Sequence, residues 1–206
     1  IDLYQLHWPD RPVAMFGATG LAYKHLDGKS VPIEDILGAL DSHVKAGKIR
    51  HVGLSNETAW GTMEFLRHAK ERGLPRMQSI QNAYSLINRV FELGQAEIAH
   101  REQVGLLAYS PLGQGYLTGK YQKGAQPEGS RKKLFNRLQR YERPQTETAI
   151  ARYLEIARKF GLDPAQLALQ FVTTRPFVTS NIIGATTMEQ LKTNIGSINV
   201  KWTDEL

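Results

Sequence analysis

Short apolar runs alternate with stretches of helical periodicity along the whole chain. The apolar runs have about the length of buried strands and lie at 1–7, 49–55, 78–82, 105–109 and 179–184. Helical patterns, with an apolar position at every third or fourth residue, occupy 33–46, 57–72, 92–101, 164–174 and 188–197. Strands that alternate with helices, without a hairpin signal, predict βα units around a parallel sheet.

Capping residues mark the starts of several of these helices. Asn56 precedes the pattern at 57–72, and Asp163 with Pro164 opens the pattern at 164–174 after Gly161 has ended the helix before. The stretch Thr187 to Gln190 has the form of a capping box. Free N–H groups at such a helix start attract a phosphate.

The spacing of the units favours a (β/α)₈ barrel. Ser55 and Gln81 are 26 positions apart, and Gln81 and Tyr109 are 28 apart, close to the roughly 31 residues per unit of a barrel. An open doubly wound sheet is the rival, but it needs G-x-G-x-x-G after a strand, and Gly113-Gln-Gly115 lacks the third glycine. We therefore expect residues 1–206 to form a single barrel-type domain.

Composition narrows the class of protein. The chain is 41% hydrophobic and 22% charged, which is ordinary for a globular protein. The lack of cysteine excludes disulfides and thiolate metal sites, and suits a cytoplasmic location. No run approaches the length of a membrane span. Because the chain begins without Met and inside a predicted strand, we expect it to be part of a longer protein.

The residues that end the apolar runs are the candidates for chemistry, because function in a barrel lies at the carboxyl ends of its strands. These residues are His7, Ser55-Asn56, Gln81-Asn82, Tyr109-Ser110 and Gly184-Ala185-Thr186. The set holds no carboxylate cluster and no H-x-x-x-H, which argues against a metal site and against a two-carboxylate glycosidase. Amide and hydroxyl groups beside an aromatic ring suit a planar ligand that carries a carboxamide.

Each candidate also has a plainer interpretation. Ser55-Asn56 could be a helix cap, Tyr109 a core aromatic residue, and Gln81 a buried amide. The stretch 130–143 carries six Lys or Arg against one Glu, so a nucleic-acid patch is the alternative there. The net charge of +6 and this stretch suit a ligand with several phosphate charges. We favour a loop that closes on such a ligand, and expect no nucleic-acid partner.

Five stretches together resemble the aldo-keto reductase family, in the branch of Tas-like proteins and potassium-channel β subunits. They are DLYQLHWP at 2–9, GKIRHVGLSN at 47–56, QNAYSLINR at 81–89, LLAYSPLGQGYLTGKY at 106–121 and IIGATTMEQLKTNI at 182–195. The resemblance implies a (β/α)₈ barrel of which this chain supplies about strands four to eight, the N-terminal strands being missing. It also implies NADPH-dependent reduction of an aldehyde or ketone to an alcohol.

The resemblance assigns roles residue by residue. It makes His7 the active-site histidine beside the substrate carbonyl. The remaining matches are to cofactor contacts, namely Ser55, Asn56 and Gln81 on the nicotinamide carboxamide, Tyr109 on its ring, Ser110, Leu112 and Gln114 along the pyrophosphate, Lys120 and Arg131 on a covering loop, and Thr186, Gln190 and Asn194 at the adenosine 2′-phosphate and adenine. No metal is implied.

The family's catalytic tyrosine, lysine and aspartate lie before its fourth strand, which is where this chain begins. We therefore expect residues 1–206 alone to be inactive and poorly soluble, since His7 can orient a carbonyl but poorly replaces the proton donor. The alternative function is a catalytically weak nucleotide-sensing or partner-binding module on the same barrel.

Overall fold

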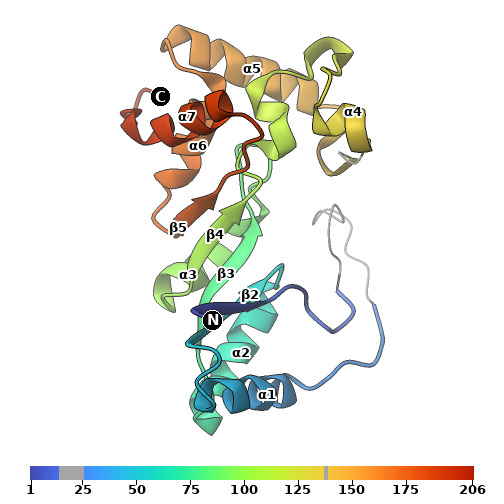
Figure 1. Cartoon of the computed structure of the whole chain (residues 1–206), viewed down its shortest axis with the longest axis vertical. Helices are drawn as coiled ribbons and strands as arrows, with labels where there is room; N and C mark the ends of the chain where they lie inside the picture. The colour runs from blue at the N-terminus through green and yellow to red at the C-terminus, as the bar shows by residue number, and fades with distance from the viewer. Residues whose placement is uncertain (14–25, 137–138) are drawn as a thin grey trace. The chain divides into compact units, whose positions relative to one another are not determined.

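The structure, a computed structural model, describes residues 1–13, 26–136 and 139–206. The described residues form five strands, β1 (Leu3–Leu6), β2 (His51–Ser55), β3 (Met77–Ala83), β4 (Gly105–Tyr109) and β5 (Val178–Ile182). They make one sheet in the order β1-β2-β3-β4-β5, which is also their order along the chain (Figure 1). The pairs β1–β2 and β2–β3 are parallel. The prediction of an α/β chain with a parallel sheet is confirmed, and every strand ends within two residues of its predicted bounds.

Helices connect the strands as the periodicity predicts. The α-helices are α1 (Ile33–Lys45), α2 (Ala59–Arg72), α3 (Gln95–Arg101), α4 (Arg131–Phe135), α5 (Thr146–Lys159), α6 (Pro164–Thr173) and α7 (Met188–Gly196). Short 3₁₀ helices are η1 (Val90–Glu92), η2 (Gly113–Thr118), η3 (Gln122–Gly124), η4 (Gln139–Tyr141) and η5 (Ser197–Asn199). The single helix predicted at 92–101 is in two pieces, because Gly94 between η1 and α3 has a positive φ of 115°.

Two of the predicted helix starts are confirmed, and a third is wrong. The Asp163 carboxylate accepts hydrogen bonds from the N–H groups of Ala165 and Gln166, and so caps α6. Thr187 Oγ1 accepts from Gln190 N and caps α7. Asn56, by contrast, does not cap α2, whose first turn is capped by the Thr58 hydroxyl.

The chain divides into two compact units, each with its own core. Unit 1 comprises Ile1–Asn82 and Val90–Leu107, and unit 2 comprises Ala83–Arg89 and Ala108–Leu206. In unit 1 the inward faces of the strands meet the apolar faces of the helices, and the fully buried side chains include Leu37, Val52, Leu54, Met77, Ile80 and Leu106. Buried and half-buried residues alternate along β4, as the pleat sends successive side chains to opposite faces. Four successive residues of β2, from Val52 to Ser55, are buried, so both faces of that strand are covered.

The core of unit 2 is rich in tyrosine. Its central cluster consists of Tyr116, Leu117, Tyr121, Tyr141, Ile150 and Ala168. Helix α6 is almost wholly buried from Leu167 to Val172, which explains why its sequence is apolar without a clear polar face. The hydroxyl of a buried tyrosine requires a hydrogen-bond partner. For Tyr116 the partners are the charged side chains of Glu142 and Lys132.

Candidate active site

In unit 1 the structure brings together four predicted site residues at the carboxyl ends of β1, β2 and β3. The pairing of Ser55 with Gln81 ends the β2–β3 register. Ser55 Oγ donates a hydrogen bond to Gln81 O at 2.7 Å, and Asn56 N donates to the same carbonyl at 3.0 Å. The Asn56 amide nitrogen donates to His7 O at 2.9 Å and to Ser55 Oγ at 3.1 Å. These bonds join the three strand ends into one rigid rim.

Asn56 reaches both partners because its backbone is left-handed, with φ of 55°. Asparagine adopts this region more readily than most residues that carry a side chain. The plainer interpretation of Ser55-Asn56 as a helix cap is wrong, since the Thr58 hydroxyl caps α2. Ser55 is buried, and the Asn56 side chain links the ends of β1 and β2 through its hydrogen bonds to His7 O and Ser55 Oγ.

The His7 side chain is exposed at this rim and lies against its neighbour Trp8. The two ring centroids are 4.7 Å apart and the planes are inclined by 24°, which is a stacked arrangement. Such a contact favours the stacked orientation of the imidazole by about 0.5–1.5 kcal/mol. Its main-chain carbonyl is held by Asn56 at the same time.

Unit 2 carries the other nine predicted site residues, beginning with Tyr109 at the end of β4. The Tyr109 hydroxyl accepts a hydrogen bond from Arg140 Nη1 at 3.1 Å, and the guanidinium carbon lies 5.7 Å from the ring centroid. Tyr109 O accepts from Tyr84 N. The ring is partly buried, so Tyr109 is neither a simple core residue nor a freely rotating one.

After Tyr109 the chain makes a tight turn that includes Ser110, Leu112 and Gln114. Ser110, Gly113, Gln114 and Gly115 all have positive φ, between 55° and 98°. A Cβ added to Gly115 would lie 3.0 Å from Lys120 Nζ, so the Lys120 ammonium faces the backbone of this turn. A turn of left-handed residues beside a cation suits a phosphate group, which is the group that the resemblance places here.

The basic stretch is only partly available to a ligand. Arg131 is the first residue of α4 and is exposed, as expected of a cation that meets a phosphate. Lys132 instead lies 3.0 Å from Glu142 Oε1 and 3.4 Å from the Tyr116 hydroxyl. Arg137, another cation of this stretch, lies outside the described residues.

Sequence reasoning missed the cluster of Tyr116, Lys132 and Glu142. The Tyr116 hydroxyl donates to Glu142 Oε1 at 2.9 Å. The hydrogen bond with Lys132 lowers the pKa of Glu142, and the same bond raises the pKa of Lys132. Burial, with help from Glu142, raises the pKa of Tyr116. The phenol is therefore a poor proton donor at neutral pH, and the cluster holds the excursion after β4 together.

The last predicted group, Thr186, Gln190 and Asn194, follows β5 and runs along α7. Gln190 Oε1 accepts from Thr186 N at 2.9 Å and from Thr186 Oγ1 at 3.2 Å, so these two residues lie together and are exposed. Asn194, one turn further on, is 5% exposed. The structure thus joins Thr186 to Gln190 and places Asn194 in a buried position.

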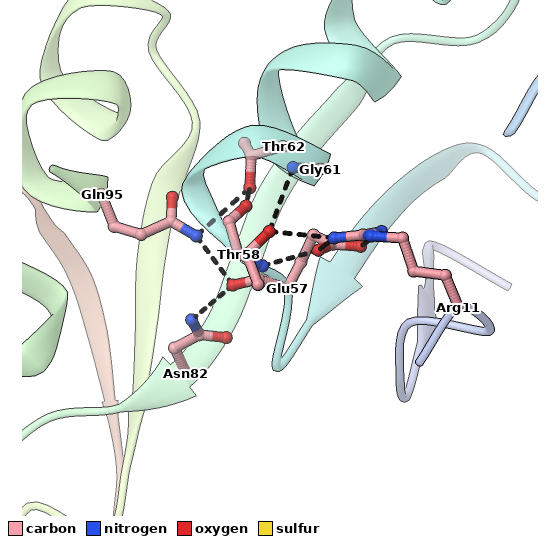
Figure 2. Close-up of polar contacts among 7 residues, drawn as sticks. All are labelled: Arg11, Glu57, Thr58, Gly61, Thr62, Asn82 and Gln95. Atoms are coloured by element: carbon pink, nitrogen blue, oxygen red, sulfur yellow. Dashed lines mark hydrogen bonds and ion pairs between the residues drawn. The ribbon is translucent and has the colours of Figure 1, made fainter. Parts of the chain in front are cut away.

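A second feature that sequence reasoning missed is Glu57, directly after Asn56. Its buried carboxylate pairs with Arg11, and its main-chain carbonyl accepts from the amides of Asn82 and Gln95 (Figure 2). The partners come from parts of unit 1 that are 25 to 46 positions away. The only signal in the sequence was an acidic residue next to the strand end. A single carboxylate at such a position is too common to identify a functional contact.

The described part of the chain offers neither a metal site nor a membrane-spanning helix. No three His, Asp or Glu side chains there are grouped as metal ligands. Within the same residues no helix combines the length and the apolar character that crossing a membrane requires.

Comparison with known proteins places this geometry in context. The family model described as aldo/keto reductase family matches residues 1–206. Protein tas of Escherichia coli is 52% identical over 206 residues, which are 100% of this chain and 59% of that protein. A protein of Babesia bovis named aldo-keto reductase is 41% identical over 95% of this chain and 73% of its own length.

A third relative carries a cofactor in its name. The aldo-keto reductase yakc [NADP(+)] of Schizosaccharomyces pombe is 30% identical over 89% of this chain and 54% of its own length. The chain thus spans a little over half the length of two of these three relatives.

Proposed function

Because this chain belongs to the aldo/keto reductase family, we propose that the protein is an NADPH-dependent oxidoreductase that reduces aldehydes or ketones to alcohols. The observation that carries the proposal is the meeting of His7, Ser55, Asn56 and Gln81 at three neighbouring strand ends. In barrels and in open α/β sheets, ligands bind at the carboxyl ends of the strands. The name of the S. pombe relative supports the cofactor.

We further infer that the five strands are strands four to eight of one (β/α)₈ barrel. Their order in the sheet equals their order in the chain, as closure of a barrel from successive βα units requires. The family supports the barrel, and the order of β1 to β5 supports five consecutive strands; their numbering as four to eight is what the resemblance implies.

In unit 1 the proposed role of the site residues is to bind the substrate carbonyl and the nicotinamide carboxamide. NADPH, when bound, would supply the hydride, and the proton that completes the alcohol would come from the tyrosine that the resemblance places before the family's fourth strand. The imidazole of His7, oriented by the Trp8 ring, donates a hydrogen bond to the substrate carbonyl oxygen and stabilises the negative charge that develops there. Ser55, Asn56 and Gln81 offer the donors and acceptors that a carboxamide needs.

In unit 2 the proposed work is to hold an aromatic ring and phosphates. The Tyr109 ring, whose hydroxyl is fixed by Arg140, offers a stacking surface. The turn from Ser110 to Gly115, with Lys120 beside it, fits a pyrophosphate. Arg131, Thr186, Gln190 and Asn194 complete this assignment, in which Arg131 and Thr186 meet the 2′-phosphate.

Replacement of His7 tests the reductase directly. We expect His7→Ala to lower the turnover of an aldehyde by about 10²–10³-fold, since an oriented donor at the developing charge is lost. The affinity for NADPH should not change. The measurements are NADPH oxidation followed by absorbance and a fluorescence titration of NADPH, on the intact protein.

The matched control is His100→Ala, which removes an exposed histidine on α3 in the same unit. Normal turnover in His7→Ala, combined with weaker NADPH binding, would show that His7 contacts the cofactor instead. NADPH binding without any turnover in the unaltered protein would favour the nucleotide-sensing module.

A further inference from the structure

We propose that Arg11 and Glu57 form a positioning pair that holds the main chain of residues 7–11 and thereby fixes the orientation of His7. The pair lies beside the rim that the proposed function uses, so the inference rests on that function for its catalytic consequence. The positioning of the His7 ring is a property of unit 1 alone, so it can be measured without turnover.

The contact between the two side chains is bidentate and mostly hidden from water. Arg11 Nη1 donates to Glu57 Oε2 at 3.0 Å, and Arg11 Nη2 donates to Glu57 Oε1 at 2.5 Å. The Glu57 side chain is 2% exposed and that of Arg11 is 18% exposed. Arg11 Nη2 also donates to Thr58 Oγ1 at 2.9 Å. A planar guanidinium that meets a carboxylate along two bonds fixes angle as well as distance.

Glu57 is held in place from the opposite side, so it can serve as an anchor. Its main-chain carbonyl accepts from Asn82 Nδ2 at 3.1 Å and from Gln95 Nε2 at 2.8 Å. Its carboxylate accepts from Thr58 N at 2.6 Å at the start of α2, where the helix dipole favours negative charge. Figure 2 shows these contacts converging on Glu57 from β3, α3 and α2, with Arg11 reaching in from the segment after β1.

The segment that leads from His7 to Arg11 is therefore tied at both ends. At one end His7 O accepts from Asn56 Nδ2. At the other end Arg11 binds Glu57, the residue next to Asn56. A closed ring of covalent bonds and hydrogen bonds results, and His7 and Trp8, whose side-chain rings stack, are two of its members.

The guanidinium also lies over the Trp60 ring, 4.8 Å from its centroid. Arg11, Trp8, Ser55 and Trp60 line a cavity of about 380 Å³ in unit 1. The pair therefore forms part of the wall of this cavity. It also holds the chain segment that carries His7. Loss of either partner would leave the other buried group without its opposite charge, and movement of the segment would then let water reach that group.

Gly61 provides a way to disturb the pair without removing a charge. A Cβ at this position would overlap the Glu57 carboxylate and the Arg11 guanidinium. Gly61 lies inside α2, where alanine is otherwise preferred over glycine by about 1 kcal/mol. Gly61→Ala thus keeps both partners and favours the helix, and it displaces only the contact between them.

The experiment compares Gly61→Ala, Glu57→Gln and Arg11→Lys with two matched controls in the intact protein. Gly38→Ala makes the same change in α1, where the added Cβ has no neighbour within 4 Å. Asp2→Asn breaks the ion pair with Arg50, whose side chains are 84% and 76% exposed respectively. The measurements are the NMR resonances of the His7 ring, the NADPH dissociation constant, and kcat and KM for an aldehyde.

We expect all three test variants to shift the His7 ring resonances, because the ring moves relative to Trp8, and both controls to leave them in place. In the test variants kcat for the aldehyde should fall about 10–100-fold, as small displacements of a reacting group do, with the NADPH dissociation constant unchanged.

Unmoved His7 resonances in Gly61→Ala and Glu57→Gln would overturn the inference, as would equal losses of kcat in Gly38→Ala. If Glu57→Gln does not fold, Gly61→Ala and Arg11→Lys still decide the question. If the unaltered protein reduces no aldehyde, the proposed function fails, and the His7 resonances still show whether the pair positions the ring.

Discussion

At the scale of single residues, the ion pair of Lys132 and Glu142 contacts the hydroxyl of Tyr116, a residue of the core of unit 2. The Lys132 ammonium lies 3.0 Å from Glu142 Oε1, and Tyr116 is buried with a raised pKa. A carboxylate that gains such a partner on folding has a lower pKa in the folded state. Its ionisation is then linked to stability.

This linkage predicts the pH dependence of unfolding. The contribution of Glu142 is present above its unfolded pKa, near the ordinary value of 4.5, and is lost as the pH falls through the lower folded value. The raised pKa of Lys132 acts in the opposite range, so its contribution is present at neutral pH and is lost only as the pH rises through the folded value. Glu142→Gln should therefore cost stability at pH 7 and almost none in acid.

The cost at neutral pH should be at most about 1 kcal/mol, because the Glu142 side chain is 35% exposed and water screens the pair. Urea unfolding of the two proteins at neutral and at acid pH measures the difference. A difference in unfolding free energy that stays constant between the two conditions would contradict the linkage.

Residues of the candidate site differ in how far the sequence could predict them. Ser55, Asn56 and Gln81 end apolar runs, and any barrel puts such residues at one rim. That Asn56 would bond to His7 O depends on a left-handed backbone that its letter alone does not indicate. The role of Glu57 could not be predicted, because its partner Arg11 lies 46 positions away in the sequence and no local motif indicates that the two form a pair.

At the scale of elements, strands and amphipathic helices followed from periodicity, because burial of one face imposes it. The internal structure of the stretch between β4 and α5 did not follow. It is built from η2, η3, α4 and η4, which are too short to show a period. Several left-handed residues, such as Gln114 and Lys123, redirect the chain there, and non-glycine residues in this conformation leave little trace in a sequence.

Helix α6 provides a test of packing at this scale. Leu169 is 1% exposed, so Leu169→Ala should lower the free energy of unfolding by about 2–5 kcal/mol through lost burial and a residual cavity. Ile195→Ala on α7, where the side chain is 59% exposed, is the control and should cost less than about 0.5 kcal/mol. Thermal or urea unfolding compares the two, and equal losses would mean that α6 is not a core helix.

At the scale of the whole molecule, charge favours an anionic cofactor. The chain carries a formal net charge of +6, and a positive field attracts a ligand with several phosphate charges. Lys120 and Arg131 are exposed in unit 2, so each can contact such a ligand without first breaking a buried ion pair.

We therefore expect the intact protein to bind NADPH at least about 10-fold more tightly than NADH, since a charge-assisted contact contributes roughly 1.5–3 kcal/mol. The preference should weaken as salt is added, because salt screens exposed charges. Tryptophan-fluorescence titrations at two salt concentrations measure both effects. Arg131→Gln should reduce the preference, and equal affinities for the two nucleotides in the unaltered protein would contradict the assignment of the 2′-phosphate contacts.

The ring that closes from His7 through Arg11 to Glu57 and Asn56 has a consequence for how such a protein can diversify. The ring closes at Arg11, so the connection that leads on to α1 starts from an anchored residue. Insertions into an anchored connection cost little free energy. Changes of sequence beyond Arg11 can therefore spare the histidine where they keep the contact of Val31 N with the Asp10 carboxylate, whereas changes at Ser30, Val31 or Pro32 alter the lining of the cavity itself and so its selectivity.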